Sequence, residues 1–160
     1  MLITQISVIF INMVFNNKFI LASSSKSRFN ILKNNKLSFT AIIPRCDEEQ
    51  LKKKLIKKKT PIKKISLELA RFKSQSISSL FKNKLVVGSD TMIDFFGKPL
   101  NKAKDLKRAK LQIKKISGKK HIIYSSASAF YNNNEVWKST QKTSIIIRRL
   151  SNQEIDKYLI

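Results

Sequence analysis

The sequence predicts an α/β domain built around a mixed β-sheet. Two observations lead to this class: short apolar runs alternate with amphipathic stretches along the first part of the chain, and two long alternating segments joined by a turn follow them. The 160 residues, 42% of them hydrophobic, suffice for one domain with a core. Three glycines, one cysteine and the lack of sustained heptads exclude collagen, disulfide scaffolds and bundled coiled coils.

The first elements read as strand, loop, helix and strand. Residues 18–22, KFILA, are a short apolar run that ends in the serine cluster 23–25. The stretch after this cluster has apolar residues at helical spacing, which predicts a helix. Residues 37–43, LSFTAII, form the second predicted strand, and Pro44 ends it.

A charged stretch and a long helix come next. The lysines of residues 47–61, DEEQLKKKLIKKKTP, are expected on a solvated helix face or a mobile arm, and a functional basic patch is the alternative. Pro61 begins a helix that runs to about residue 81. Its apolar face is formed by Ile62, Ile65, Leu69 and Phe72.

The middle of the chain contains a third strand and another helix. Residues 85–87, LVV, read as a buried strand that runs into 88–91, GSDT. Residues 92–96 either extend this strand or pair beside it. After a Gly-Lys-Pro turn, an amphipathic helix is predicted from about 102 to 116, closed by Ser117 and Gly118 as a C-cap.

A hairpin and a final helix complete the chain. Residues 121–130 and 136–148 alternate enough to be two long antiparallel strands joined at the asparagines 132–134. Ser151 and Glu154 have the spacing of a capping box, which opens the last helix.

The net charge at first suggests a nucleic-acid partner. It is +23, from 33 lysines and arginines against 10 acids. Only six of the 33 are arginines, which leaves 27 lysines, and Asn and Ile are abundant too, as AT-rich codons would produce. Because lysine is the weaker choice for bidentate phosphate recognition, the composition argues against nucleic acid as the main partner.

The cysteine count and the start of the chain bear on location. Cys46 is alone, which favours a reducing cytoplasm. The apolar residues 1–15 are too short to span a bilayer and lack a basic region ahead of them, so no membrane partner is expected. Met13 offers an alternative start, and we expect residues 1–17 to be an extension outside the fold.

Three features could carry phosphate chemistry. The loop 23–28 lies where a strand feeds a helix, so its N–H groups, hydroxyls and guanidinium suit an anion, although serine is also an ordinary helix cap. Asp90 directly follows a buried strand, where a carboxylate can hold Mg²⁺ or orient a water, although it is also a common turn former there. Asp47 and Glu48 are a second acidic site or two solvated acids.

Single cations and nucleophiles are less informative. Lys73, in the middle of a helix, and Lys98, in the Gly-Lys-Pro turn, could each neutralise phosphate charge, but one lysine among 27 says little. Cys46 is more simply a half-buried thiol than a nucleophile, and His121 more simply packs or bonds locally.

Seven weak motifs follow one another over residues 18–160: FILASSSKSRFNIL, CDEE, LARFKSQS, VVGSDT, GKPLNKAKD, LQIKKISGKKH and RLSNQEIDKYL. Taken in this order, they resemble the Maf family of nucleoside triphosphate pyrophosphatases. The resemblance implies a fold similar to that of inosine triphosphate pyrophosphatases, with a mixed, mainly antiparallel twisted sheet flanked by helices. It also implies hydrolysis of a nucleoside triphosphate to its monophosphate and pyrophosphate, with Mg²⁺ or Mn²⁺, and it allows a homodimer.

The resemblance assigns roles to individual residues. Asp90 matches the proton acceptor that activates the attacking water, and Glu48 matches an acid that holds the metal together with Asp90. Thr91 falls where substrate preference is partly set. The substrate-binding residues that the resemblance implies are Ser25, Arg28, Lys73, Thr91 and Lys98.

The chain departs from the family pattern in three places. Lys26 and Ser27 replace the proline and first arginine of Ser-Pro-Arg-Arg, which predicts weaker or rearranged phosphate binding. Phe72 replaces the acid that usually precedes the helix lysine. The family also continues past residue 160 through a Gly-rich segment, so we expect the domain of residues 18–160 to lack its C-terminal part.

Alternative functions follow from these departures. A preference for 7-methyl-GTP is the runner-up over dTTP or UTP. A catalytically impaired nucleotide- or RNA-binding remnant is the alternative from another class, and it predicts salt-sensitive RNA retention without turnover.

Overall fold

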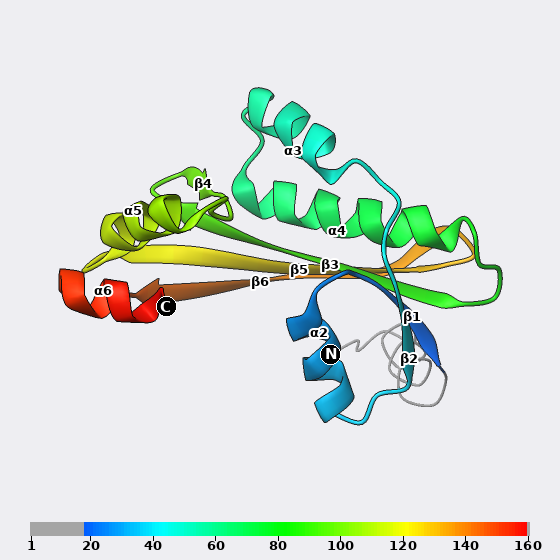
Figure 1. Ribbon diagram of the computed structural model, residues 1–160. Coiled ribbons are helices and arrows are strands. Elements are labelled where there is room, and N and C mark those ends of the chain that lie inside the picture. Colours follow the sequence, from blue (N-terminus) through cyan, green and yellow to red (C-terminus); the bar gives the residue numbers. More distant parts are fainter. Residues whose placement is uncertain (1–17, 160) are drawn as a thin grey trace, which may run out of the picture.

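A single sheet organises the fold. In the computed structural model, which describes residues 18–159, the strands follow the order β2-β1-β3-β5-β6, and β4 pairs beside β3 (Figure 1). β1 is parallel to β2 and β3, whereas the β3–β4, β3–β5 and β5–β6 pairs are antiparallel. The strands are β1 (Phe19–Ala22), β2 (Phe39–Ile42), β3 (Leu85–Phe95), β4 (Lys98–Leu100), β5 (Lys120–Tyr131) and β6 (Asn134–Ile146). The predicted mixed, mainly antiparallel sheet flanked by helices is confirmed.

The helices pack against this sheet and against one another. The long helix α4 lies along β3 and β5, and α3 lies on the outer side of α4 (Figure 1). The α2 helix lies on the other side of the sheet from α4. The helices α5 and α6 lie together near the start of β5 and the end of β6, away from the turn that joins these two strands. The helices are α2 (Lys26–Asn34), α3 (Glu48–Lys57), α4 (Ile62–Ser78), α5 (Leu106–Ile116) and α6 (Asn152–Tyr158).

The two faces of the sheet have separate apolar cores. Beneath α4, the buried residues Ile65 and Leu69 pack with Met92 of β3. On the opposite face, Phe19 and Leu85 pack with Leu32 of α2 and its neighbours. Alternation of side chains along β3 explains the division, because Leu85 and Met92 differ by an odd number of positions and so point to opposite faces.

Most predicted elements form, with differences at their ends. Residues 92–95 extend β3 rather than starting a new strand. The hairpin turn is confirmed at Asn132 and Asn133, whose φ angles are 47° and 61°, a region that asparagine tolerates. The helix predicted from 102 begins at Leu106, because Asp105 caps it by accepting a hydrogen bond from the Arg108 amide.

Two further predictions are settled by the helices. The charged stretch after residue 47 forms the regular helix α3, so it is not a mobile arm. The capping box of Ser151 and Glu154 is confirmed, with both reciprocal hydrogen bonds present.

No helix within residues 18–159 is both long and apolar enough to cross a membrane. The expectations about residues 1–17, including the alternative start at Met13, lie outside the described residues.

Candidate active site

Lys73 joins two carboxylates from distant parts of the chain. Its ammonium lies 2.8 Å from Oε2 of Glu48 and 2.8 Å from Oδ1 of Asp90, and it also donates to the Ser89 carbonyl at 3.4 Å. The Lys73 side chain is only 7% exposed, against 13% for Asp90 and 41% for Glu48. The structure therefore brings together Lys73, Glu48 and Asp90, which the sequence patterns had indicated only as separate candidates.

Gly88 sets the distance between α4 and β3. A Cβ atom on Gly88 would lie 2.4 Å from the Ala70 carbonyl oxygen and 2.6 Å from the Ser74 amide nitrogen, closer than such contacts occur. The missing side chain therefore lets the helix backbone approach the strand directly. This approach places Lys73 against Asp90, which is two residues beyond Gly88 on the same face of β3.

Glu48 reaches the cluster from the first turn of α3. Asp47 is the N-cap of this helix, and its Oδ1 accepts a hydrogen bond of 2.8 Å from the Gln50 amide. Its neighbour Glu48 instead forms the ion pair with Lys73. The structure thus separates two adjacent acids that the sequence left equivalent: one caps a helix, and the other belongs to the site.

The serine loop forms a second group around Arg28. Ser25 caps α2 by accepting a hydrogen bond from the Arg28 amide, and Ser23 accepts one from Nη1 of Arg28 at 3.4 Å. The Nη2 group of Arg28 donates to Oγ1 of Thr91 at 3.2 Å. No carboxylate of residues 18–159 pairs with Arg28, so its charge is available to an anion.

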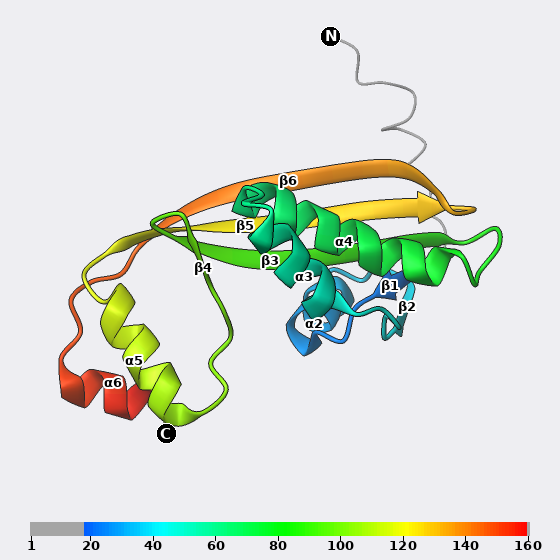
Figure 2. The ribbon, with the colours of Figure 1, turned by 90° about the horizontal axis from the view of Figure 1, so that it is seen from above.

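The two groups meet at an open segment of β3. On one side, β3 pairs with β1 as far as Gly88 and then with β4 from Ile93, so Ser89–Met92 have no strand partner on that side. Figure 2 shows α2 with β1 and β2 along this side of β3, and β4 with α5 farther along it. Asp90 and Thr91 are consecutive, so they point to opposite faces of the strand within this open segment. A ligand at the open segment could therefore contact both groups.

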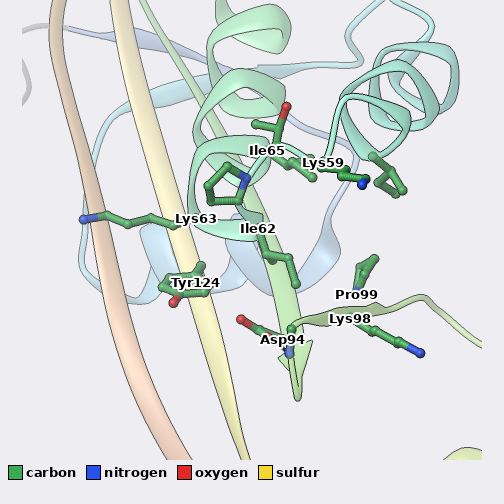
Figure 3. Close-up of a pocket in the computed structure, with 12 residues that line it drawn as sticks. Lys59, Ile62, Lys63, Ile65, Asp94, Lys98, Pro99 and Tyr124 are labelled. Atoms are coloured by element: carbon green, nitrogen blue, oxygen red, sulfur yellow. Dashed lines mark hydrogen bonds between the residues drawn. The ribbon is translucent and has the colours of Figure 1, made fainter.

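Lys98 lies elsewhere. It lines a cavity of about 500 Å³ that is also bordered by Asp94 and Tyr124. Figure 3 shows Lys98 pointing away from Ile62 at one side of this cavity. Lys98 pairs in register with Phe95, five residues past Asp90, or about 16 Å along the strand. Of the substrate-binding residues that the sequence suggested, Lys98 is the one that the structure does not bring to the open segment.

Two supporting residues, Ser66 and Ser126, escaped the sequence analysis. The buried Ser66 hydroxyl is within hydrogen-bonding distance of the Ser126 hydroxyl, at 2.9 Å, and of the Asp90 carbonyl oxygen, at 3.4 Å. Ser66 precedes Lys73 by seven residues, two helical turns, and this spacing was the available signal. Cys46 is half-buried beside Ser76, and burial raises the pKa of its thiol while the hydrogen bond with Ser76 opposes that rise.

A metal ion would find two carboxylates here. Within residues 18–159, no three His, Cys, Asp or Glu side chains lie close enough to hold an ion together. Glu48 and Asp90 are oxygen ligands of the kind that Mg²⁺ prefers, and this ion commonly takes one or two carboxylates together with substrate phosphates. The residues therefore fit an ion whose remaining ligands come from a bound phosphate.

Comparison with known proteins identifies the family of this chain. The sequence profile of the family described as "Maf-like protein" matches residues 18–160. The chain belongs to the Maf-like protein family. This Maf-like protein is 33% identical over 140 residues to a nucleoside triphosphate pyrophosphatase of Ruegeria pomeroyi, a match that covers 88% of this chain and 70% of the relative.

Other relatives carry narrower names. A 7-methyl-GTP pyrophosphatase of Bartonella henselae is 34% identical, with coverage of 88% of this chain and 70% of that protein. A dTTP/UTP pyrophosphatase of Wolbachia pipientis is 35% identical over 145 residues, with coverage of 89% and 70%. Among solved structures, the Ham1 protein of Staphylococcus aureus superposes with a TM-score of 0.47 at 16% identity, over 81% of this chain and 70% of that one.

Proposed function

We propose that this Maf-like protein hydrolyses a nucleoside triphosphate to a nucleoside monophosphate and pyrophosphate. The observation that carries the proposal is the cluster of Lys73, Glu48 and Asp90 beside the open segment of β3, with Arg28 across from it. The names of three relatives, each at least 33% identical, support the same reaction class. Water attacks the α-phosphorus, the bond from that phosphorus to the bridging oxygen breaks, and pyrophosphate leaves.

Asp90 is the proposed proton acceptor. Its Oδ1 is held by the Lys73 ammonium, while Oδ2 has no hydrogen bond within residues 18–159 and is available to a water. The Ser66 hydroxyl lies 3.4 Å from the Asp90 carbonyl oxygen and 3.2 Å from that of Tyr124, so it can donate to either strand beside this carboxylate. General-base assistance of this kind contributes about 10²–10⁴-fold to a rate.

Arg28 and Lys73 are the proposed partners of the substrate's phosphate groups. Arg28 lacks a carboxylate partner among residues 18–159 and presents a planar fork of donors, which suits phosphate oxygens. Lys73 supplies a point charge beside the reacting group. A Mg²⁺ or Mn²⁺ ion, held by Glu48 and Asp90 together with the substrate, would neutralise phosphate charge when bound.

Replacing Asp90 with asparagine tests the proposal. Asp90→Asn is expected to lower kcat for pyrophosphate release by about 10²-fold or more, because the amide does not accept the proton. Asp94→Asn is the matched control, since Asp94 lies on the same strand and face and its Oδ1 can still accept the Gly97 amide. Equal turnover in Asp90→Asn and the unaltered protein would remove Asp90 from the mechanism.

Substrate preference is a finer part of the proposal. We infer a nucleoside triphosphate as the substrate class, with 7-methyl-GTP as the alternative, since relatives of nearly equal identity carry both names. A panel of 7-methyl-GTP, GTP, dTTP and UTP, ranked by kcat/KM, separates them. A cytoplasmic location and a homodimer stay predictions, which fractionation and sedimentation would check.

The remnant hypothesis gives the opposite result in the same assay. It predicts nucleotide or RNA retention without pyrophosphate release, and retention that falls steeply with salt because the +23 charge carries it. Turnover that is lost in Asp90→Asn contradicts it directly.

A further inference from the structure

The ammonium of Lys73 stands between the two carboxylates that would hold a cation. Glu48 and Asp90 approach it at equal distances of 2.8 Å from different elements, α3 and β3. With a side chain 7% exposed, Lys73 is shielded from water far more than the lysines on the surface of α3. A charge this buried requires partners, and these two carboxylates are its ion-pair partners within residues 18–159.

This arrangement opposes a metal ion that arrives alone. A divalent cation at Glu48 and Asp90 would compete with Lys73 for the same oxygens and would be repelled by the ammonium. The two carboxylates and one ammonium sum to a single negative charge, and no third acidic, His or Cys ligand completes a group within residues 18–159. The protein alone is thus a poor site for the ion.

A phosphate changes the balance. Its oxygens offer Lys73 another anionic partner, and the flexible four-carbon stem of lysine allows the ammonium to turn toward it. The same oxygens supply the ligands that two carboxylates lack. Glu48 is 41% exposed, so it also has room to reorient once Lys73 releases it.

We propose that Lys73 is an internal counter-ion that keeps divalent metal out of the Glu48–Asp90 pair until a nucleotide binds. Metal loading is then conditional on the phosphate, and Lys73 moves from neutralising the carboxylates to neutralising the substrate. This inference rests on the proposed function for the identity of the phosphate ligand, but its central claim concerns the protein and the metal alone.

Titration with Mn²⁺ in the absence of nucleotide tests the inference. The fraction of free Mn²⁺ is followed by electron paramagnetic resonance for the unaltered chain, Lys73→Met and the control Lys110→Met, after circular dichroism verifies that each is folded. Lys110→Met makes the same change in net charge but removes an ion pair with Asp156 in the α5–α6 region. Lys73→Met is expected to bind Mn²⁺ about tenfold or more tightly than the other two proteins.

Further variants keep the result interpretable. Lys73→Gln retains a hydrogen-bond donor between the carboxylates and serves if Lys73→Met does not fold. Adding Asp90→Asn to either variant is expected to abolish the gained affinity, which locates it at this pair. The inference is overturned if the unaltered chain binds Mn²⁺ as tightly as the Lys73 variants, or if the gain survives Asp90→Asn.

The outcome is separable from that of the proposed function. A chain that hydrolyses nucleotides but gains no Mn²⁺ affinity without Lys73 retains the function and loses the inference. A chain that releases no pyrophosphate but shows the gain retains the counter-ion and loses the function.

Discussion

Lys73 and Lys98 are the same residue type with the same proposed duty toward phosphate, yet they occupy opposite environments. Lys73 is buried on α4 with two carboxylates at 2.8 Å, whereas Lys98 is exposed on a three-residue strand at the edge of a separate cavity. The difference arises from what each element packs against, since α4 lies on the sheet and the β3–β4 turn projects from it. Of these two lysines, Lys73 is the one that lies beside the proposed proton acceptor, so its charge is expected to act on the reacting phosphate.

The sharpest test of this comparison replaces each lysine with methionine. Lys73→Met is expected to lower kcat by about 100-fold or more, because it removes a preorganised charge beside the reacting phosphate. Lys98→Met is expected to act mainly on KM, by less than about tenfold, because any contact that Lys98 makes with the substrate lies outside the cluster. Steady-state kinetics on one nucleotide decides, and comparable losses of kcat in both variants would erase the distinction.

The next test disturbs the geometry behind Lys73. Gly88→Ala is expected to cost about 1–3 kcal/mol of unfolding free energy, because the new Cβ would force the backbones of α4 and β3 apart. Gly97→Ala, near Lys98, is the control: no atom lies within 4 Å of its Cβ, so only the positive φ of 77° is strained, at about 1 kcal/mol. Urea denaturation measures both, and a larger loss for Gly97→Ala contradicts the packing argument.

A smaller effect is expected across the open segment. Arg28→Lys keeps the charge but loses the fork that reaches Ser23 and Thr91 together. We expect KM for the nucleotide to rise about tenfold with kcat little changed. Lys26→Arg, in the same first turn of α2, is the reciprocal control, and an unchanged KM in Arg28→Lys would show that the guanidinium makes no bidentate contact.

The smallest effect concerns an exposed ion pair, the opposite of the Lys73 cluster. A hydrogen bond from Arg148 and others from Ser151 lower the pKa of Glu154 to about 2. The pKa of Glu154 is lower in the folded chain than its value of about 4.3 in an unfolded chain. The ionised Glu154 therefore stabilises the fold fully above that pH, and this stabilisation is lost as the pH falls through about 2. NMR shifts of α6 amides should therefore change near pH 2 in the unaltered chain and stay flat there in Glu154→Gln.

Sequence reasoning found the pieces of the site but not their partners. Asp90 was recognisable because it follows an apolar run, and the capping box because its spacing is local. The choice between Asp47 and Glu48 needed the position of the α3 N-cap, which fixes one acid on its own helix and frees the other. The burial of Lys73 depends on Gly88, fifteen residues away, and no local pattern reports that contact.

Long-range contacts also explain the other omissions. The Arg28–Thr91 hydrogen bond joins residues 63 positions apart, and Ser66 meets Ser126 across 60. The family resemblance supplied Thr91 as a candidate, but neither propensity nor periodicity places it opposite Arg28. It also grouped Lys98 with the cluster, whereas the strand register sets them about 16 Å apart.

The backbone contact at Gly88 ties one half of the site together more closely than the other half. Because the backbones of α4 and β3 meet at Gly88 with no side chain between them at that point, the backbone positions of Lys73 and Asp90 are expected to move together. Among residues 18–159, the hydrogen bond from Arg28 to Thr91 is the one that joins the serine loop to the open segment of β3. A phosphate that draws Arg28 away from Thr91 would therefore leave the backbone that carries Lys73 and Asp90 where it is, and only their side chains would have to adjust.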